Sequence, residues 1–338
     1  MRSTRLATFA AASVALLACT DRGRLAHGEA TSLIIVAVDT LWSPVESDVA
    51  TALAPRHVAV TDEASFVITQ ISPADPAWRD LRNFRQVIPI GLATDAWVAP
   101  VLEKRPAGEL PAIVEVQDVW ANGQGVTAVV LPESDPQGAL RSVLPQLGSL
   151  LDQRFRQYAL SRMFASRADT ALRDTLERTA GFSLLLPNVY RRTVVGSTHV
   201  FRHHAEMGGE LMRTITIASR PGVTASPTRQ MAITWRDSLS GTAYDLLQTV
   251  DTAHIQEHTL EGDPAGLEVQ GVWQSADPGW PAAGPFIDRI VSCPAQNRTY
   301  LIDAWLFAPG KKKYEYMIQL QTILDSFRCG AAAAAAGA

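Results

Sequence analysis

The chain is a succession of short apolar runs separated by polar segments, and the spacing of the apolar positions predicts secondary structure. Uninterrupted apolar runs of four to eight residues are typical of buried strands. Such a run at residues 33–39 predicts a buried strand, and further strands are predicted at residues 66–71, 86–92, 114–120 and 126–131. Asn122-Gly123 stands between the last two runs, and this dipeptide is a strong signal for a hairpin.

Helical patterns are interleaved with these strands. Ser43, Pro44 and Glu46 have the order of an N-cap, a first helical residue and a capping box, and they predict a helix that runs to about residue 53. Residues 137–166 have helical spacing around Pro145, where proline bends a helix. The first half of the chain is therefore predicted to be a mixed α/β unit.

Beyond residue 166 strands and helices no longer alternate regularly. A helix is expected at residues 169–179, with Gly181 as its stop. Further helices are predicted at 236–247 and 316–327, and strands at 182–186, 199–206, 211–218, 268–274, 289–292 and 299–307. This order indicates an antiparallel sheet covered by helices on one face. We therefore predict an α+β protein of two units, each a mostly antiparallel or mixed sheet covered by helices, which meet between residues 165 and 181.

The first 30 residues fit neither unit. Two arginines precede an uncharged run at residues 6–18, which is too short to span a bilayer because spanning takes about 20 apolar residues. The run matches a secretory leader, and Cys19 follows a small residue at its end. The pattern predicts a signal peptide at residues 1–18, lipidation of Cys19, and a polar tether over residues 19–30. Ordinary leader cleavage with an incidental cysteine is the alternative.

The residue after Cys19 is Thr20 rather than an aspartate, so the usual inner-membrane retention signal is missing. We expect a bacterial outer-membrane protein that faces the periplasm, with the membrane as a partner through its N-terminal lipid and an envelope protein as a second partner. The folded units are expected at residues 31–165 and 166–329. The alanine-rich residues 330–338 are too few to hold a helix alone and predict a disordered tail.

Charge and cysteine content restrict the function classes further. Without the two leader arginines, the 30 basic and 34 acidic residues leave a net charge of −6, and nucleic-acid binding requires a basic surface. No nucleic-acid partner is expected, and the chain has no nucleotide-binding motif that would indicate a cofactor. Cys293 and Cys329 are an even pair that suits a disulfide in an oxidising compartment, while two buried free thiols fit the sequence equally well.

One motif points to metal chemistry. His254, Glu257 and His258 match the HxxEH pattern of inverted zinc proteases, which requires a helix. Thr252 and Ile255 favour a strand instead. Residues four apart in a strand lie about 13 Å apart, too far to share one zinc ion. We predict no metal site and assign no catalytic residue. A non-enzymatic binding or accessory module is the expected function, and a hydrolase whose site is assembled from distant residues is the alternative.

Two features suggest contact surfaces. Trp280 lies in a proline- and glycine-rich loop near Phe286, and an exposed loop tryptophan is typical of a contact surface. The alternative is a Trp280 ring folded back over the edge of the sheet. Residues 311–313 are three lysines ahead of the final helix, which fit a solvated turn or, alternatively, contact with anionic lipid headgroups.

Several short patterns occur in a defined order: Leu41-Trp42, Val119-Trp120-Ala121, Arg236-Asp237-Ser238-Leu239, Gly271-Val272-Trp273, Gly284-Pro285-Phe286 and Ala308-Pro309-Gly310-Lys311. Over residues 32–328 their order resembles the bacterial lipoproteins grouped as domain of unknown function 4837. Ala283-Gly284 replaces that family's double glycine, and residues 250–262 depart from its pattern. The resemblance implies an envelope lipoprotein and no activity. The second half also resembles the PsbP-type fold, which serves mostly as an accessory or binding module.

Overall fold

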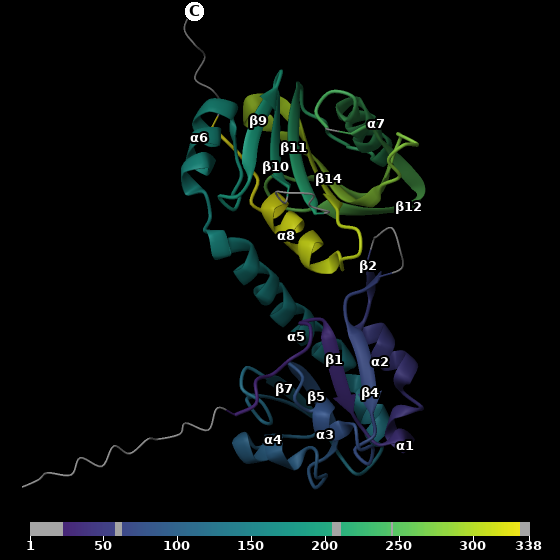
Figure 1. Cartoon of the computed structure of the whole chain (residues 1–338). Helices are drawn as coiled ribbons and strands as arrows, with labels where there is room; N and C mark the ends of the chain where they lie inside the picture. The colour runs from purple at the N-terminus through teal and green to yellow at the C-terminus, as the bar shows by residue number, and fades with distance from the viewer. Residues whose placement is uncertain (1–22, 58–62, 205–210, 245, 332–338) are drawn as a thin grey trace, which may run out of the picture.

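The computed structural model describes residues 23–57, 63–204, 211–244 and 246–331. Two sheets organise the molecule, and Figure 1 shows them one above the other, joined by the long helix α5 (Pro136–Met163). The lower, N-terminal unit holds a five-stranded sheet, and the upper, C-terminal unit holds a seven-stranded one. The predicted α+β class, with mixed or mostly antiparallel sheets, is confirmed.

The sheet of the N-terminal unit is largely parallel. Its strands are β1 (Ser32–Val36), β4 (Val67–Ile71), β5 (Gln86–Leu92), β6 (Ala112–Gln117) and β7 (Gly125–Leu131). They lie in the order β4-β1-β5-β7-β6, and only the edge strand β6 is antiparallel to its neighbour. Leu33 and Ile35 face one core and Ile34 and Val36 face the other, which explains why β1 is apolar at every position rather than at alternate ones.

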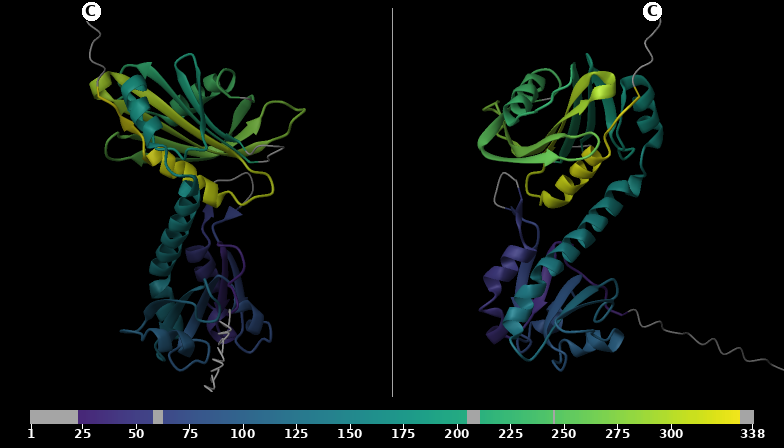
Figure 2. Two further views of the ribbon diagram at one scale, coloured as in Figure 1. Left: turned by 60° about the vertical axis from the view of Figure 1, so that its left-hand side comes forward. Right: turned by 180° about the vertical axis from the view of Figure 1, so that it is seen from behind.

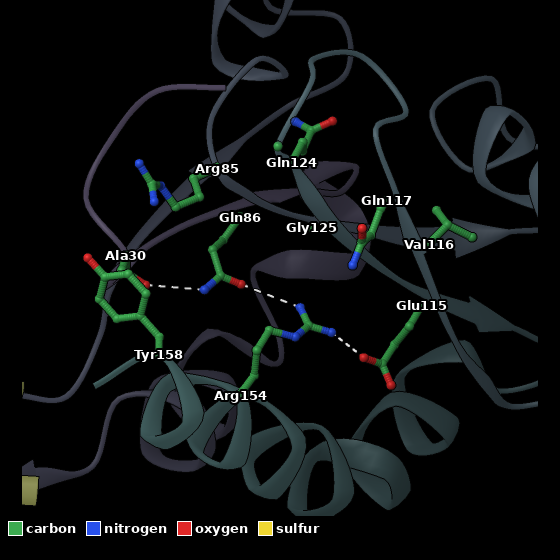
Figure 3. A pocket seen from close by; sticks show the side chains of 11 residues that line it. Ala30, Arg85, Gln86, Glu115, Val116, Gln117, Gln124, Gly125, Arg154 and Tyr158 are labelled. Atoms are coloured by element: carbon green, nitrogen blue, oxygen red, sulfur yellow. Dashed lines mark hydrogen bonds and ion pairs between the residues drawn. The ribbon is translucent and has the colours of Figure 1, made fainter. Parts of the chain in front are cut away.

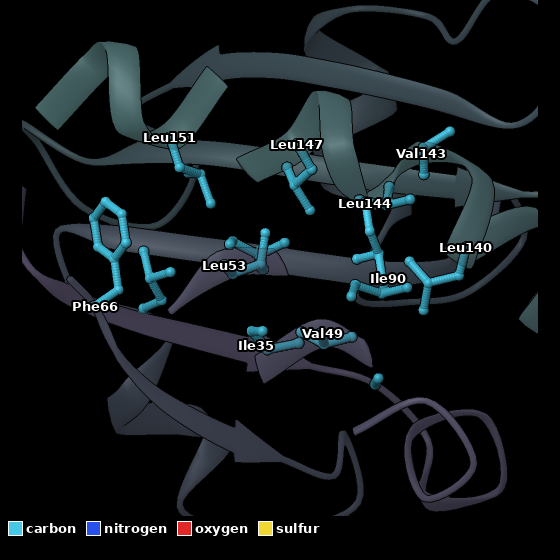
Figure 4. Close-up of a cluster of buried hydrophobic side chains, with 14 of the residues drawn as sticks. Ile35, Val49, Leu53, Phe66, Ile90, Leu140, Val143, Leu144, Leu147 and Leu151 are labelled. Atoms are coloured by element: carbon cyan, nitrogen blue, oxygen red, sulfur yellow. The ribbon is translucent and has the colours of Figure 1, made fainter. Parts of the chain in front are cut away.

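Helices cover both faces of this sheet. One face packs against α1 (Asp39–Trp42), α2 (Glu46–Leu53) and the first part of α5, and Figure 4 shows the leucines of α5 over Ile35, Ile90 and Phe66. The other face packs against α3 (Trp78–Leu81) and α4 (Ala99–Lys104). A short hairpin of β2 (Arg56–His57) and β3 (Glu63–Ala64) extends towards the C-terminal unit. The N-terminal unit is a three-layer α/β/α arrangement.

The helix predicted to begin at Pro44, after the N-cap Ser43, begins two residues later, at Glu46. Ser43 instead ends α1, and its N–H donates to the carbonyl of Asp39. The N-cap of α2 is Val45, whose side chain makes no capping bond, so the predicted capping box is wrong. Burial of Leu41 and Trp42 in the core accounts for the extra turn, because it holds the chain against the sheet before α2 starts. The six-residue α4 was not predicted, because it is too short to show a period.

The predicted tether is shorter than expected. Residues 23–30 lie against the N-terminal unit, where Leu25 pairs with Asn122 and His27 pairs with Phe84. The N–H of Ala26 donates to the carbonyl of Asn122 at 2.9 Å. These backbone bonds fix a segment whose polar sequence shows no periodicity. The leader, Cys19 and the alanine-rich residues 332–338 lie outside the described residues.

The sheet of the C-terminal unit is antiparallel throughout, in the order β12-β13-β14-β15-β11-β10-β9. Its strands are β9 (Arg191–Val195), β10 (Thr198–His204), β11 (Met212–Pro221), β12 (Gln248–Leu260), β13 (Gly266–Ser275), β14 (Ala283–Cys293) and β15 (Arg298–Phe307). Strand β9 was not predicted. Its five residues are all exposed, so the strand presents no apolar run.

Both faces of this second sheet are covered, so the prediction of helices on one face is wrong. Helices α6 (Thr170–Ala180) and α8 (Tyr314–Asp325) pack on one face, together with β8 (Phe182–Ser183) and β16 (Arg328–Cys329). Helix α7 (Arg229–Ser240) covers the other face. It begins and ends seven residues before the predicted range, because the hydroxyl of Thr228 caps its N-terminus by accepting from the N–H of Met231.

Other helix signals were correct. Asp169 caps α6 by accepting from the N–H of Leu172, and Gly181 ends α6 in the left-handed conformation. Cys293 and Cys329 form a disulfide with a Cα–Cα distance of 5.7 Å, which joins β14 to β16. The N–H of Gly330 donates to the carbonyl of Gly181, so the predicted tail starts too early by at least this residue.

Helices α5 and α8 hold the two units together (Figure 2). Tyr314, the first residue of α8, inserts into the core of the N-terminal unit and stacks on Phe155 and on His57. Its hydroxyl donates to Asp152 on α5. Because a residue from one unit completes the core of the other, the units are packed together rather than merely linked.

The three lysines ahead of α8 belong to this junction. Glu63 accepts hydrogen bonds from the backbone N–H groups of Lys313 and Tyr314, at 2.6 and 3.2 Å. Lys312 contacts the hydroxyl of Thr31. The prediction of a solvated turn is therefore wrong for Lys312 and Lys313, which are half-buried. The carboxylate of Glu63 offsets the cations that would otherwise oppose the dipole of α8.

Candidate functional site

The topology of the N-terminal sheet places a crevice at one edge. From β1 the chain crosses to β4 on one side and then returns to β5 on the other side. In open α/β sheets, ligands bind where such a reversal separates the connections beyond the carboxyl ends of the strands. A cavity of about 610 Å³ lies there, within the range of small-molecule sites. We call this cavity the carboxyl-edge crevice.

Three loops line the crevice, and each follows a parallel strand. The lining residues are Val38, Thr40 and Leu41 after β1, Gly91, Leu92, Asp95 and Trp97 at the end of β5, and Leu131, Glu133, Pro136 and Gln137 at the end of β7. The walls are mainly aliphatic and aromatic side chains, with two carboxylates among them. This combination of apolar walls and a few polar groups is typical of ligand pockets.

The end of β5 fixes the polar and aromatic groups of the crevice. Oδ2 of Asp95 accepts from the N–H of Leu92 at 2.7 Å, which folds the carboxylate back over the strand. A side chain at Gly91 would overlap this carboxylate and the indole of Trp97. Trp97 donates from Nε1 to the carbonyl of Ile90 at 2.9 Å. Glycine at position 91 therefore makes room for both side chains to line the cavity.

The chemistry of the crevice favours donors and cations over anions. Asp95 and Glu133 are both carboxylates, and the lining contains no lysine, arginine or histidine. On the opposite wall, Nε2 of Gln137 donates to the carbonyl of Thr40 at 3.4 Å, which bridges the loops after β7 and β1. A ligand with an apolar body and an ammonium or hydroxyl group would match the walls and satisfy the carboxylates.

A second cavity, of about 390 Å³, lies at the opposite end of the same strands (Figure 3). Arg154 of α5 crosses it and forms an ion pair with Glu115, and it donates to Thr127 at 3.1 Å. Gln86 donates from Nε2 to the carbonyl of Ala30 at 3.2 Å. Since protein groups already engage the guanidinium, this cavity serves to fasten the N-terminal segment and is the weaker candidate for a ligand site.

A cluster of buried charges lies between α7 and the C-terminal sheet. Arg236, Asp288 and Asp303 are each 0% exposed. Nε of Arg236 donates to Asp303 at 3.2 Å, and its Nη2 donates to Gln248 at 2.5 Å. Tyr244 donates its hydroxyl to the second oxygen of Asp303 at 2.6 Å. Arg236 is the first residue of one of the short patterns noted in the sequence, but that pattern gave no sign that the arginine is buried.

The two aspartates of this cluster have different surroundings. Burial raises the pKa of Asp288 well above its usual range, and repulsion from Asp303 raises it further. Asp303 accepts the hydrogen bonds of Arg236 and Tyr244. These groups bind one another in a closed interior, which is the arrangement of a structural ion pair rather than of an open site.

The histidine motif does not form a metal site. His254, Glu257 and His258 lie on the exposed strand β12, so the helix that the zinc-protease pattern requires is absent there. His254 contacts Asp251 instead, at 3.0 Å between Nδ1 and Oδ2. Within residues 23–331, leaving aside the gaps in the description, no group of three or more histidine, cysteine or acidic side chains could hold a metal ion.

The expected contact surface is not formed as predicted. Phe286 is fully buried beneath the guanidinium of Arg236, 4.5 Å from its ring centre, so its assignment to a surface is wrong. Its strand, β14, is far longer than the short segment predicted and carries Phe286 into the core. Trp280 is half-buried and packs against Phe307 at 5.1 Å, which is the folded-back alternative.

Sequence reasoning missed the residues of the crevice. A signal was present, because Thr40, Asp95 and Glu133 each follow a strand that was predicted correctly. What the pattern did not show was that these three strands are neighbours and parallel, which brings their carboxyl ends together.

Comparison with known proteins supports the family resemblance for half of the chain. Residues 169–326 match the family model described as Domain of unknown function (DUF4837). The resemblance noted over residues 32–328 is thus confirmed for the C-terminal unit. No curated protein is matched.

The chain is also similar to solved structures, and these comparisons support no argument about function. They include the Ran-binding protein Mog1p of Saccharomyces cerevisiae, with 11% identity, a TM-score of 0.31 and coverage of 45% of this chain and 91% of that one. A second is PsbP (CyanoP) of Synechocystis sp. PCC 6803, with 11% identity, a TM-score of 0.32 and coverage of 44% and 87%. A PsbP protein is therefore among the structural neighbours, as the sequence suggested.

Proposed function

We propose that this protein is a lipid-anchored bacterial envelope protein whose N-terminal unit binds a small organic ligand without transforming it. The ligand is an apolar molecule that carries an ammonium or hydroxyl group. The proposed location is the periplasmic side of the outer membrane, with Cys19 as the anchor.

The location rests on two observations. The leader ends at Cys19 after a short uncharged run, which is the pattern of a lipoprotein signal. The disulfide between Cys293 and Cys329 suits an oxidising compartment such as the periplasm, because disulfides are rare in the cytosol. Among the residues that the structure describes, no helix is long and apolar enough to cross a bilayer.

The binding role rests on the carboxyl-edge crevice. It has the volume of a ligand site, it lies where parallel sheets bind ligands, and it presents two carboxylates between apolar walls. Thr40, Asp95 and Glu133 are the described lining residues with nucleophilic or proton-carrying groups, and no serine, cysteine or histidine lies beside them to complete a hydrolytic triad. Binding is therefore the function that these side chains support best.

Binding of benzylamine to the purified protein, measured by saturation-transfer NMR, tests this role. Benzylamine combines an apolar ring with an ammonium group, and phenylacetate is the matched anion. We expect benzylamine to bind, and Asp95→Asn and Glu133→Gln each to weaken it roughly tenfold, since each removes one charge from the site. Phenylacetate is expected not to bind.

Glu103→Gln is the matched control, because Glu103 is an exposed carboxylate on α4 and does not line the crevice. Equal binding of the amine and the acid, or equal losses in all three variants, would refute the crevice as the binding site. Hydrolysis of an ester or amide substrate that is lost in Asp95→Asn would instead support the hydrolase alternative.

The anchor has a separate test. Mass spectrometry of the mature N-terminus is expected to show an acylated Cys19, and a Cys19→Ser variant is expected to leave the membrane fraction. An unmodified N-terminus at another residue would overturn the anchor and the proposed location while leaving the crevice untouched.

A further inference from the structure

The amino ends of the parallel strands form a second edge of the N-terminal sheet, opposite the crevice. Three segments form this edge: residues 23–29, residues 79–85 from within α3 to the start of β5, and residues 118–124 between β6 and β7. We call this surface the amino edge. It is the first part of the structure to follow Cys19 in the sequence.

The three segments are fixed to one another by backbone hydrogen bonds. The N–H of Asn122 donates to the carbonyl of Arg24 at 2.8 Å, and the N–H of Arg85 donates to the carbonyl of His27 at 2.7 Å. Nε2 of Gln124 donates to the carbonyls of Arg82 and Phe84, at 2.6 and 2.7 Å. The amino edge is thus a built surface rather than a set of independent loops.

Cations gather on this edge in a protein that is acidic overall. Arg24, Arg79 and Arg85 are exposed, and Lys104 reaches the edge from α4 by donating to the carbonyls of Gln117 and Asp118 at 3.0 and 2.8 Å. Within the three segments Arg24, Arg79, Arg82 and Arg85 stand against Glu29, Asp80 and Asp118, so together with Lys104 the cations of the edge exceed its carboxylates by two.

Apolar groups accompany the cations. Leu25 is 77% exposed, the highest value among the large apolar side chains described. Trp78 and Trp120 are half-buried, and their rings meet edge to face at 5.4 Å. Tryptophan is enriched where proteins meet the headgroup region of a bilayer, and arginine is attracted to anionic headgroups there. Both tryptophans pack partly against the core beneath the edge, so Leu25 and the exposed arginines are the groups that the amino edge presents.

We propose that the amino edge rests on anionic phospholipid headgroups. This proposal extends the proposed function, because it depends on Cys19 carrying the lipid. The chain between Cys19 and Gly23 spans at most roughly 14 Å, so Gly23, where the amino edge begins, is held within that distance of the anchor. No other surface of the described residues follows the anchor so closely in the sequence.

The orientation has a consequence for the crevice. Parallel strands run from one edge of the sheet to the other, so the carboxyl-edge crevice and the amino edge lie at opposite ends of β1, β5 and β7. With the amino edge on the membrane, the crevice opens towards the aqueous side. A water-soluble ligand then reaches the site without crossing the headgroup layer.

The test attaches the protein to vesicles chemically, so that it does not depend on acylation in cells. The oxidised chain from Cys19 onward has one free thiol, which couples to a maleimide lipid. The vesicles contain phosphatidylcholine alone or together with phosphatidylglycerol. Hydrogen–deuterium exchange is then compared between residues 23–29 and 118–124 on the amino edge and residues 91–97 at the crevice.

We expect phosphatidylglycerol to slow exchange at the amino edge by roughly threefold or more and to leave residues 91–97 unchanged. The triple variant Arg24→Glu, Arg79→Glu, Arg85→Glu is expected to lose this protection. The matched control is Arg178→Glu, Arg229→Glu, Arg298→Glu, which reverses three exposed arginines of the C-terminal unit and should keep it.

The proposed orientation would be overturned if phosphatidylglycerol slowed exchange equally at the amino edge and at residues 91–97. It would also be overturned if the triple variant of the amino edge kept its protection. These outcomes are independent of the anchor. An unacylated Cys19 in cells would refute the anchor, whereas a failure in the vesicle experiment would refute the surface alone.

Discussion

The two units differ in where they place acidic side chains: at the ends of strands in the N-terminal unit and in the middle of strands in the C-terminal unit. In the N-terminal unit Asp95 and Glu133 follow the ends of strands and line an open crevice. In the C-terminal unit Asp288 and Asp303 lie in the middle of strands and are sealed beneath α7. The same side-chain chemistry therefore has the geometry of a binding site in one sheet and of a structural core in the other.

The difference follows from how each sheet is covered. A parallel sheet is buried on both faces, so its polar groups collect where the strands end and the chain turns. In the antiparallel sheet, α7 closes a face that would otherwise be solvated, and it carries Arg236 into contact with the acidic strand positions. These buried charged groups therefore affect the stability of the fold rather than the binding of a ligand.

The largest expected effect is in the closed cluster. Arg236→Leu removes the cation from Asp303, which keeps only the hydroxyl of Tyr244, and it removes a donor from Gln248 in a fully buried place. We expect a loss of about 3–5 kcal/mol in the free energy of unfolding, because breaking a buried ion pair leaves the remaining group without its partner. Urea denaturation measures it. Glu133→Gln at the open crevice is the comparison, and it is expected to change stability by less than about 0.5 kcal/mol.

If Arg236→Leu and Glu133→Gln had similar effects on stability, the distinction between a structural cluster and an open site would fail. A stable Arg236→Leu protein would show that the cluster tolerates an unpaired aspartate, which would require Asp303 as well as Asp288 to be protonated.

A smaller effect is expected at the junction of the units. Tyr314→Phe keeps the ring stacked on Phe155 and His57 but removes the hydrogen bond to Asp152. We expect a loss of about 1.5 kcal/mol, the lower end for a bond to a charged acceptor, because the carboxylate of Asp152 is partly exposed. Tyr158→Phe is the control. Its hydroxyl accepts a bond from exposed Arg162, so its loss should be within about 0.5 kcal/mol.

Urea titrations in which the unfolding of each unit is followed by its own probe test the junction further. Loss of the junction should separate the unfolding transitions of the units, whereas a single transition in Tyr314→Phe would show that the apolar contacts alone couple them.

The smallest effect is a dependence on pH. Burial and the nearby guanidinium of Arg213 lower the pKa of His203 to about 4. The folded protein therefore binds this proton less readily than the unfolded chain, whose histidines have a pKa near 6.5. The contribution of His203 to stability is present above about pH 6.5 and is lost as the pH falls towards 4.

His203→Gln is expected to reduce the loss of stability between pH 7 and pH 4, by less than about 1 kcal/mol because the ring is half-exposed. Thermal unfolding at several pH values measures it. His254→Gln is the control on exposed strand β12, and an equal change in both variants would contradict the role of burial.

Local patterns determined much of the secondary structure. The apolar runs located the central strands β1, β5 and β7, because a strand buried on both faces is largely apolar along its length. Asp169 and Gly181 marked the ends of α6, because capping and the left-handed glycine act within a few residues. Patterns failed where elements were short or exposed, as in α4 and β9, since these bury too little to impose a period.

Most strands and helices, and the leader pattern with its cysteine, can be predicted from the amino-acid sequence alone. Three features emerge only from the fold: Thr40, Asp95 and Glu133 line one crevice, Arg236 is buried against Asp303, and Tyr314 completes the core of the other unit. Periodicity and capping are local interactions, whereas the order of strands and the packing of one unit on another depend on contacts between residues far apart in the chain.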